Sequence, residues 1–199
     1  HDNTQPENLN FLEEVRALFN RYPSTVALGE INSEDSMSTL AEYTTAGTRL
    51  HMGYSFELLS HEFSAKHIKN TVEKFEAKKS DGWPCWAFSN HDVVRVVSRW
   101  GTRLTSRKAH VDFAKSLIAL LGTLRGTICT YQGEELGLCE AVLEKHQLHD
   151  PFGIEFWPEF KGRDGCRTPM QWLDKTDGAG FSKVEPWLPM PSEHLINRV

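Results

Sequence analysis

The chain has 199 residues, of which 39% are hydrophobic and 25% are charged, and its formal net charge at pH 7 is −5. This length accommodates one domain with its own core, or a domain and a half. The negative balance excludes a basic face large enough for a nucleic-acid backbone, and no apolar run approaches the ~20 residues that span a membrane. Residues 1–10 have neither the basic nor the apolar region of a signal peptide, so none is expected.

Cysteine usage gives an expectation about the cellular compartment. The chain has 4 cysteines, too few for a disulfide framework, and none of them forms a Cys-x-x-Cys pair. They are Cys85, Cys129, Cys139 and Cys166. We expect reduced thiols in a cytoplasmic protein.

The first predicted element is a helix that starts at a capping box formed by Thr4 and Glu7. Its apolar positions share one face at helical spacing, and they are Leu12, Val15 and Phe19. The apolar run at residues 25–28 then predicts a strand buried on both faces, because it does not alternate with polar residues. Glu30 follows at the expected end of this strand.

The same pattern recurs along the chain. A strand is expected at residues 50–56, and a helix at residues 64–78 with Ile68, Val72 and Phe75 facing inward. A strand at residues 83–89 then leads into Asn90-His91-Asp92.

The strongest predicted helix covers residues 107–124, and a strand at residues 127–131 follows it. The inward positions of this helix are Val111, Ala114, Leu117, Ile118 and Leu121. Residues 150–192 lack regular patterning but are rich in Pro, Trp and Phe, which predicts a long, ordered, functional loop.

Alternating helices and strands predict an α/β fold with parallel strands and helical crossovers. In such folds ligands bind at the carboxyl ends of the strands. Polar residues gather at these points, and they are Glu30, Asn90, His91, Asp92, Gln132 and Glu134. We therefore expect the chemistry there.

Three of these residues are candidates for acid–base or sugar chemistry. Partial burial at the sheet edge would raise the pKa of Glu30, as a general acid requires. From its position alone, a helix cap or a surface carboxylate is the commoner role for such a residue. His91 and Asp92 together can bind sugar hydroxyls or stabilise a developing cation, and the alternative is a buried polar turn.

Weaker signals occur in the last third of the chain. His146-x-x-His149-Asp150 has the spacing of metal ligands, but loop histidines near Asp are common. Residues 162–167 resemble a phosphate loop only weakly, and their two arginines are better interpreted as partners of carboxylates or hydroxyls. The tryptophans Trp157, Trp172 and Trp187 offer faces for sugar stacking, although core packing is the commoner use.

Four segments occur together in one order along the chain. They are Ala27-Leu28-Gly29-Glu30, Phe88-Ser89-Asn90-His91-Asp92, Thr130-Tyr131-Gln132-Gly133-Glu134-Glu135-Leu136-Gly137 and Gly165-Cys166-Arg167-Thr168-Pro169-Met170-Gln171-Trp172. In this order they resemble the α-glucosidases and oligo-1,6-glucosidases of the α-amylase superfamily, glycoside hydrolase family 13. Glu185-Pro186-Trp187-Leu188-Pro189 extends the resemblance over nearly the whole chain.

The resemblance implies the second half, strands five to eight, of a (β/α)8 TIM barrel. Enzymes of this family are retaining: an Asp nucleophile forms a glycosyl-enzyme, and a Glu acts first as acid and then as base. By resemblance Glu30 is the acid/base and Asp92 stabilises the transition state. His91 binds sugar hydroxyls, and Arg163 helps to close the pocket around the terminal glucose. Neither a metal nor a cofactor is implied.

Two departures from the family pattern affect the expected activity. Val93-Val94 replaces the usual Gln-Pro before Arg95, which leaves the role of Arg95 open. The Gly-Phe-Arg-x-Asp motif that carries the nucleophile is missing from residues 1–199. We therefore expect a partial catalytic domain over residues 1–199, without the nucleophile-bearing N-terminal half and the C-terminal β-domain, and inactive alone.

The expected parent activity is hydrolysis of terminal α-glucosidic bonds in small oligosaccharides such as maltose. Open sheet edges also predict self-association or pairing with a complementing N-terminal half. The alternative function is that of a non-catalytic family relative, a sugar-binding module or a partner subunit. Preference for α-1,4 or α-1,6 bonds is not readable from these residues.

Overall fold

The computed structural model describes residues 4–78, 81–173 and 177–190. These residues form two compact units. The first unit takes its described residues from 1–87 and 121–129, and the second takes them from 88–120 and 130–199.

The first unit contains four short strands, and every pairing between them is parallel. They are β1 (Leu28–Ile31), β2 (Met52–Ser55), β3 (Cys85–Ala87) and β4 (Thr127–Cys129). β1 pairs with β2 and β3 pairs with β4, and a parallel bridge between Gly53 and Pro84 places β2 beside β3. The predicted parallel arrangement of the strands is therefore confirmed.

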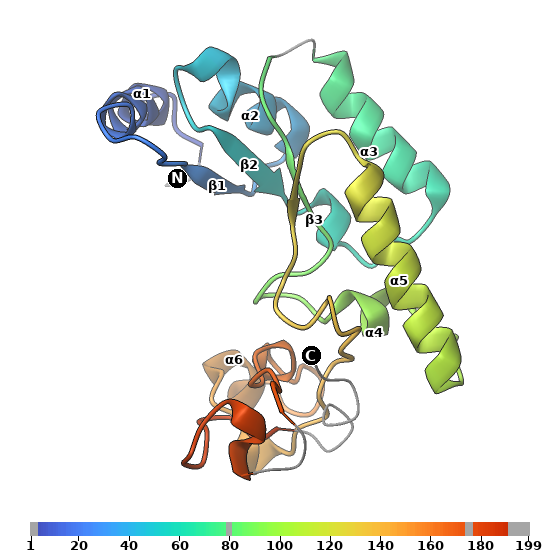
Figure 1. The fold of residues 1–199 in the computed structure, drawn as a ribbon. Coiled ribbons are helices and arrows are strands. Elements are labelled where there is room, and N and C mark those ends of the chain that lie inside the picture. The colour runs from blue at the N-terminus through green and yellow to red at the C-terminus, as the bar shows by residue number, and fades with distance from the viewer. Residues whose placement is uncertain (1–3, 79–80, 174–176, 191–199) are drawn as a thin grey trace. The chain divides into compact units, whose positions relative to one another are not determined.

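Three helices accompany these strands, and α2 packs against both β2 and α3 (Figure 1). They are α1 (Asn8–Phe19), α2 (Ser36–Tyr43) and α3 (Ala65–Ala77). The close approach of α2 depends on Gly53, because a Cβ there would lie 2.8 Å from Ile31 Cδ1 and 2.9 Å from Leu40 Cδ1. Phe75 of α3 packs edge-on against Trp86 of β3, with ring centroids 6.2 Å apart.

The start of α3 is fixed by a side-chain cap, which gives a measurable prediction. Ser64 Oγ accepts the backbone N–H of His67 at 3.0 Å. Ser64→Ala should lower the free energy of unfolding by about 1 kcal/mol, because it leaves one N–H of the first turn without its acceptor. Urea denaturation measures the loss. Glu73→Ala on the exposed face of α3 is the control, and an equal effect of both variants would contradict the cap.

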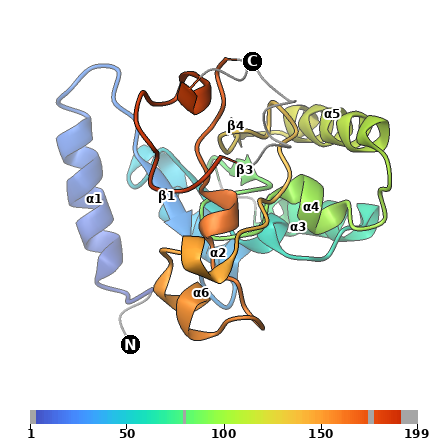
Figure 2. The same cartoon turned by 90° about the horizontal axis from the view of Figure 1, so that it is seen from below.

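The second unit has fewer regular elements: α4 (Val96–Trp100), α5 (Arg107–Thr123) up to Leu120, and α6 (Pro151–Glu155). Figure 2 shows α6 and the segment after it in orange. The long loop predicted for residues 150–192 is ordered wherever the structure describes it. A small buried cluster stabilises it, made of Ala141, Leu143, Leu148 and Leu188 with Trp157 packed against them.

Three sequence predictions about the first helix and strand are wrong. α1 begins at Asn8, and Glu7 precedes it without capping it through its side chain, so no capping box forms. β1 begins at Leu28 rather than at residue 25, because Thr25 Oγ1 donates to Phe19 O and Tyr22 O and so completes the turn after α1. β1 is also not buried on both faces, since Leu28 is 47% exposed while Ile31 is buried.

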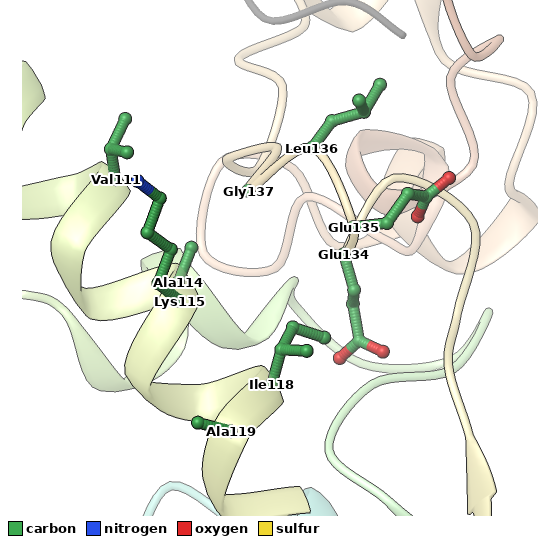
Figure 3. A pocket seen from close by; sticks show the side chains of 9 residues that line it. All are labelled: Val111, Ala114, Lys115, Ile118, Ala119, Glu134, Glu135, Leu136 and Gly137. Atoms are coloured by element: carbon green, nitrogen blue, oxygen red, sulfur yellow. The ribbon is translucent and has the colours of Figure 1, made fainter. Parts of the chain in front are cut away.

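One inward position of α5 was also predicted wrongly. Leu117 and Leu121 are buried as expected, but Ile118 is 37% exposed. It lines a cavity of about 380 Å³ between α5 and residues 134–137 (Figure 3). Part of the apolar face of α5, at Ile118, is therefore not covered by any of the described residues. Among those residues, no helix combines the length and the apolar character needed to cross a membrane.

Candidate active site

Asp92 lies in a short segment whose shape is fixed by side-chain hydrogen bonds. Asn90 is buried, and its Oδ1 accepts the backbone N–H of Asp92 at 2.9 Å. This bond forms a turn in which the Asn side chain replaces a backbone acceptor. Ser89 Oγ accepts the N–H of Val96 at 2.9 Å, which ties the start of α4 to the same segment.

Two arginines meet the Asp92 carboxylate. Its Oδ1 accepts hydrogen bonds from Arg163 Nη1 at 3.1 Å and from Arg167 Nη2 at 2.8 Å. Arg167 Nε also donates to His91 O at 2.7 Å, and His91 Nε2 lies 3.6 Å from Asp92 Oδ1. The Asp92 side chain keeps 34% exposure, so the ion pairs leave part of it open to a ligand. The structure thus brings together Asp92, His91 and Arg163, and it adds Arg167.

The position of Arg163 is fixed from behind by a second carboxylate. The side chain of Asp150 is fully buried and binds Arg163 with both oxygens, to Nε at 2.8 Å and to Nη2 at 3.1 Å. Hydrogen bonds from this guanidinium lower the pKa of Asp150 to about 2, despite its burial. Asp164 Oδ2 accepts the backbone N–H of Asp150 at 2.7 Å. Arg163 is therefore oriented before any ligand binds.

Two glycines let the backbone approach closely enough for this arrangement. A Cβ on Gly162 would lie 2.8 Å from Gly153 Cα and 3.0 Å from Asp150 Oδ2. Gly162 also has φ +75°, a conformation that favours glycine. The ring of Phe152 in α6 lies below the guanidinium, 5.9 Å from Arg163 Cζ.

Arg95, whose role the sequence left open, is buried away from any ligand. It is 1% exposed, and its Nη1 donates to Gln132 O at 2.6 Å. Its backbone N–H donates to Glu140 Oε2 at 2.9 Å, and its guanidinium lies over the Tyr131 ring. Arg95 therefore supports the Asp92 segment from inside. Glu140 was missed in the sequence because it has no motif and lies 45 residues from its partner.

Glu30 belongs to the first unit, whereas Asp92 belongs to the second. Glu30 is exposed and lies within β1, opposite Tyr54 in the register, rather than beyond the end of the strand. The expected partial burial of Glu30 is therefore wrong. Its side chain is open to a ligand on the exposed face of β1.

The metal interpretation of His146, His149 and Asp150 fails on geometry. Asp150 is occupied by Arg163, and the His149 ring packs against Trp187 with centroids 5.6 Å apart. Within residues 4–78, 81–173 and 177–190, no group of three or more His, Cys, Asp or Glu side chains is arranged to hold a metal. Residues 164–166 form a 3-10 turn, and the arginines beside them bind carboxylates, as the sequence had favoured.

Comparison with known proteins decides the family. Residues 1–197 match the family model described as "Alpha amylase, catalytic domain". The chain belongs to the alpha-amylase family. The resemblance seen in the sequence motifs is therefore confirmed, and the fold is part of the (β/α)8 barrel of that catalytic domain.

Relatives and solved structures agree with this assignment. A "Probable alpha-glucosidase" of Rhizobium meliloti (strain 1021) is 48% identical over 201 residues, covering 100% of this chain and 36% of the relative. An oligo-1,6-glucosidase of Heyndrickxia coagulans is 35% identical, covering 66% and 26%. The crystal structure of the alpha-glucosyl transfer enzyme XgtA superposes with a TM-score of 0.89 at 57% identity, covering 98% of this chain and 35% of that one. The chain spans about a third of the length of these proteins.

Proposed function

We propose that this chain is the part of a retaining α-glucosidase that contributes strands five to eight of the barrel. In this proposal Glu30 is the acid/base, Asp92 stabilises the transition state, and His91 and Arg163 bind the terminal glucose. The observation that carries it is the open Asp92 carboxylate, held by Arg163 and Arg167, in a chain whose relatives are named as glucosidases.

The role assigned to each side chain follows from the charges that develop on the substrate during the reaction. An oxocarbenium-like transition state places positive charge on the sugar ring, which an ionised Asp92 stabilises. The two arginines fix this carboxylate and leave their remaining N–H groups to donate to sugar hydroxyls. Glu30 donates a proton to the glycosidic oxygen as its bond to the anomeric carbon breaks, and later takes a proton from the attacking water.

The nucleophile of this mechanism lies outside the 199 residues, since the sequence has no Gly-Phe-Arg-x-Asp motif. Retention needs that second carboxyl group about 5–5.5 Å from the acid/base. The proposal therefore includes a complementing segment that supplies it, and small α-glucosides such as maltose as substrates. The 199 residues alone are expected to be inactive.

A hybrid enzyme tests this proposal. In the XgtA hybrid, the segment of XgtA that this chain matches is replaced by the 199 residues, and XgtA supplies the rest. We expect the hybrid to release p-nitrophenol from p-nitrophenyl α-glucoside, because the 57% identity preserves most contacts at the junctions.

The same assay on the 199-residue chain alone is the control, and it should give no release above background. A folded hybrid without activity would contradict the proposed roles of this segment. Turnover by the chain alone would contradict the external nucleophile.

A further inference from the structure

Glu140 contacts the segment that carries Asp92 through both its side chain and its backbone. Its Oε2 accepts the backbone N–H of Arg95 at 2.9 Å, and its own N–H donates to Ser98 Oγ at 2.8 Å. These two bonds attach Glu140 to α4 and to the residue just before it, three to six positions after Asp92.

Glu140 also contacts the segment that carries the two arginines. A Cβ on Gly165 would lie 2.3 Å from Glu140 Oε1 and 2.8 Å from the backbone oxygen of Ala141, so glycine lets the two segments approach this closely. The next residue, Ala141, donates its N–H to Gly165 O at 3.1 Å. Gly165 lies midway between Arg163 and Arg167, so the segment bearing both arginines packs directly on Glu140.

We propose that Glu140 is a positioning residue that holds the Asp92 segment against the Arg163–Arg167 segment. Its two contacts fix the relative positions of the groups that meet at Asp92 Oδ1, 2.8 and 3.1 Å from the two guanidiniums. The structural role of Glu140 does not depend on the proposed function. The predicted effect of Glu140 on catalysis rests on that function.

The surroundings of Glu140 shift the pKa of its carboxyl group. Burial raises the pKa of Glu140 to about 7, and the Arg95 N–H and the Arg95 and Arg99 charges only partly oppose the effect. The Cys166 thiol faces the same carboxyl group, and Glu134 acts on the same two arginines. Glu140 lines a cavity of about 250 Å³, whose other lining residues include Val94, Leu143, Leu148, Glu159 and Lys161.

Amide hydrogen exchange in the 199-residue chain tests the positioning. In Glu140→Ala, exchange should rise about tenfold or more at the Arg95 N–H and also at the Arg163 N–H. The second amide donates to Asp150 rather than to Glu140, so it reports the segment indirectly. Glu140→Gln keeps a side-chain oxygen for Arg95 and should restore protection at both sites. Glu159→Ala, at an exposed position lining the same cavity, is the matched control and should change neither.

The XgtA hybrid tests the consequence for catalysis. Glu140→Ala should raise KM about tenfold, because the misplaced arginines bind the glucose in the ground state as well as in the transition state, and it should also lower kcat, because Asp92 acts in the transition state. Glu140→Gln should keep KM and flatten its pH dependence near pH 7.

Unchanged protection at Arg163, or equal loss of protection in α3, would overturn the positioning role. So would an unchanged KM. An inactive parent hybrid would refute only the proposed function, since the exchange result stands by itself.

Discussion

In the XgtA hybrid, Glu30→Gln should lower kcat/KM for maltose by about 10²–10⁴-fold but should lower kcat/KM for p-nitrophenyl α-glucoside by less than about tenfold. In the proposed mechanism, the glucose leaving group of maltose needs a proton from Glu30 as it departs. The p-nitrophenolate leaving group is stable without one, so the first chemical step with this substrate does not depend on the acid. Steady-state kinetics with both substrates measure the difference.

Asp92→Asn should behave differently and lower kcat/KM for both substrates by a similar factor, of the order of 10²–10³. In the proposed mechanism Asp92 acts on the charge of the sugar ring, which is the same whichever group leaves. Glu34→Gln, at an exposed position three residues beyond Ile31 of β1, is the control and should leave both rates unchanged. If Glu30→Gln affected the two substrates equally, the acid role of Glu30 would be wrong.

Asp150→Asn should lower the free energy of unfolding at pH 7 by about 3 kcal/mol, because it leaves the Arg163 guanidinium without its buried charged partner. This is the lower end of the range for buried pairs, since Arg163 keeps 32% exposure and also binds Asp92. Denaturant unfolding of the 199-residue chain measures the loss.

The pH dependence of this loss follows from the pKa of Asp150, which is lowered from 3.8 to about 2 in the folded chain. A lowered pKa contributes stability that is fully present above 3.8 and is lost as the pH falls toward 2. The gap between the parent chain and Asp150→Asn should therefore narrow between pH 5 and pH 2. Asp112→Asn, at an exposed position in α5, is the control. A gap that stays constant over this pH interval would contradict the assignment.

The sequence predicted those parts of the fold that local pattern determines. Helical spacing located α3 and α5 to within one residue at each end, and the alternation of elements predicted the parallel strands. The start of β1 escaped prediction because Thr25 has the character of a strand residue but its hydroxyl completes the turn after α1. Burial along α5 also depends on what lies against each face, as the exposed Ile118 demonstrates.

In the candidate site too, the sequence predicted the residues that belong to local motifs and missed those set by tertiary packing. Asp92, His91 and Arg163 were identified through short motifs. The hydrogen bond from Arg163 to Asp92 agrees with the expectation that this arginine binds a carboxylate or a hydroxyl. The two supporting carboxylates were not identified. Asp150 was noted only as part of a weak metal-ligand spacing that was not adopted, and Glu140 lies 45 residues along the chain from Arg95. Such partners are set by tertiary packing, which one sequence without an alignment does not reveal.

The parallel direction of the four strands restricts what can extend this sheet. Among the described residues, β1 and β4 each pair with one neighbour, so the backbone hydrogen-bonding groups on their outer sides form two open edges. A segment that continued the sheet in parallel would have to run in the same direction as β1 or β4. Parallel neighbours need a crossover connection, and a hairpin cannot provide one. A complement that adds two or more consecutive parallel strands must therefore bring crossover elements of its own.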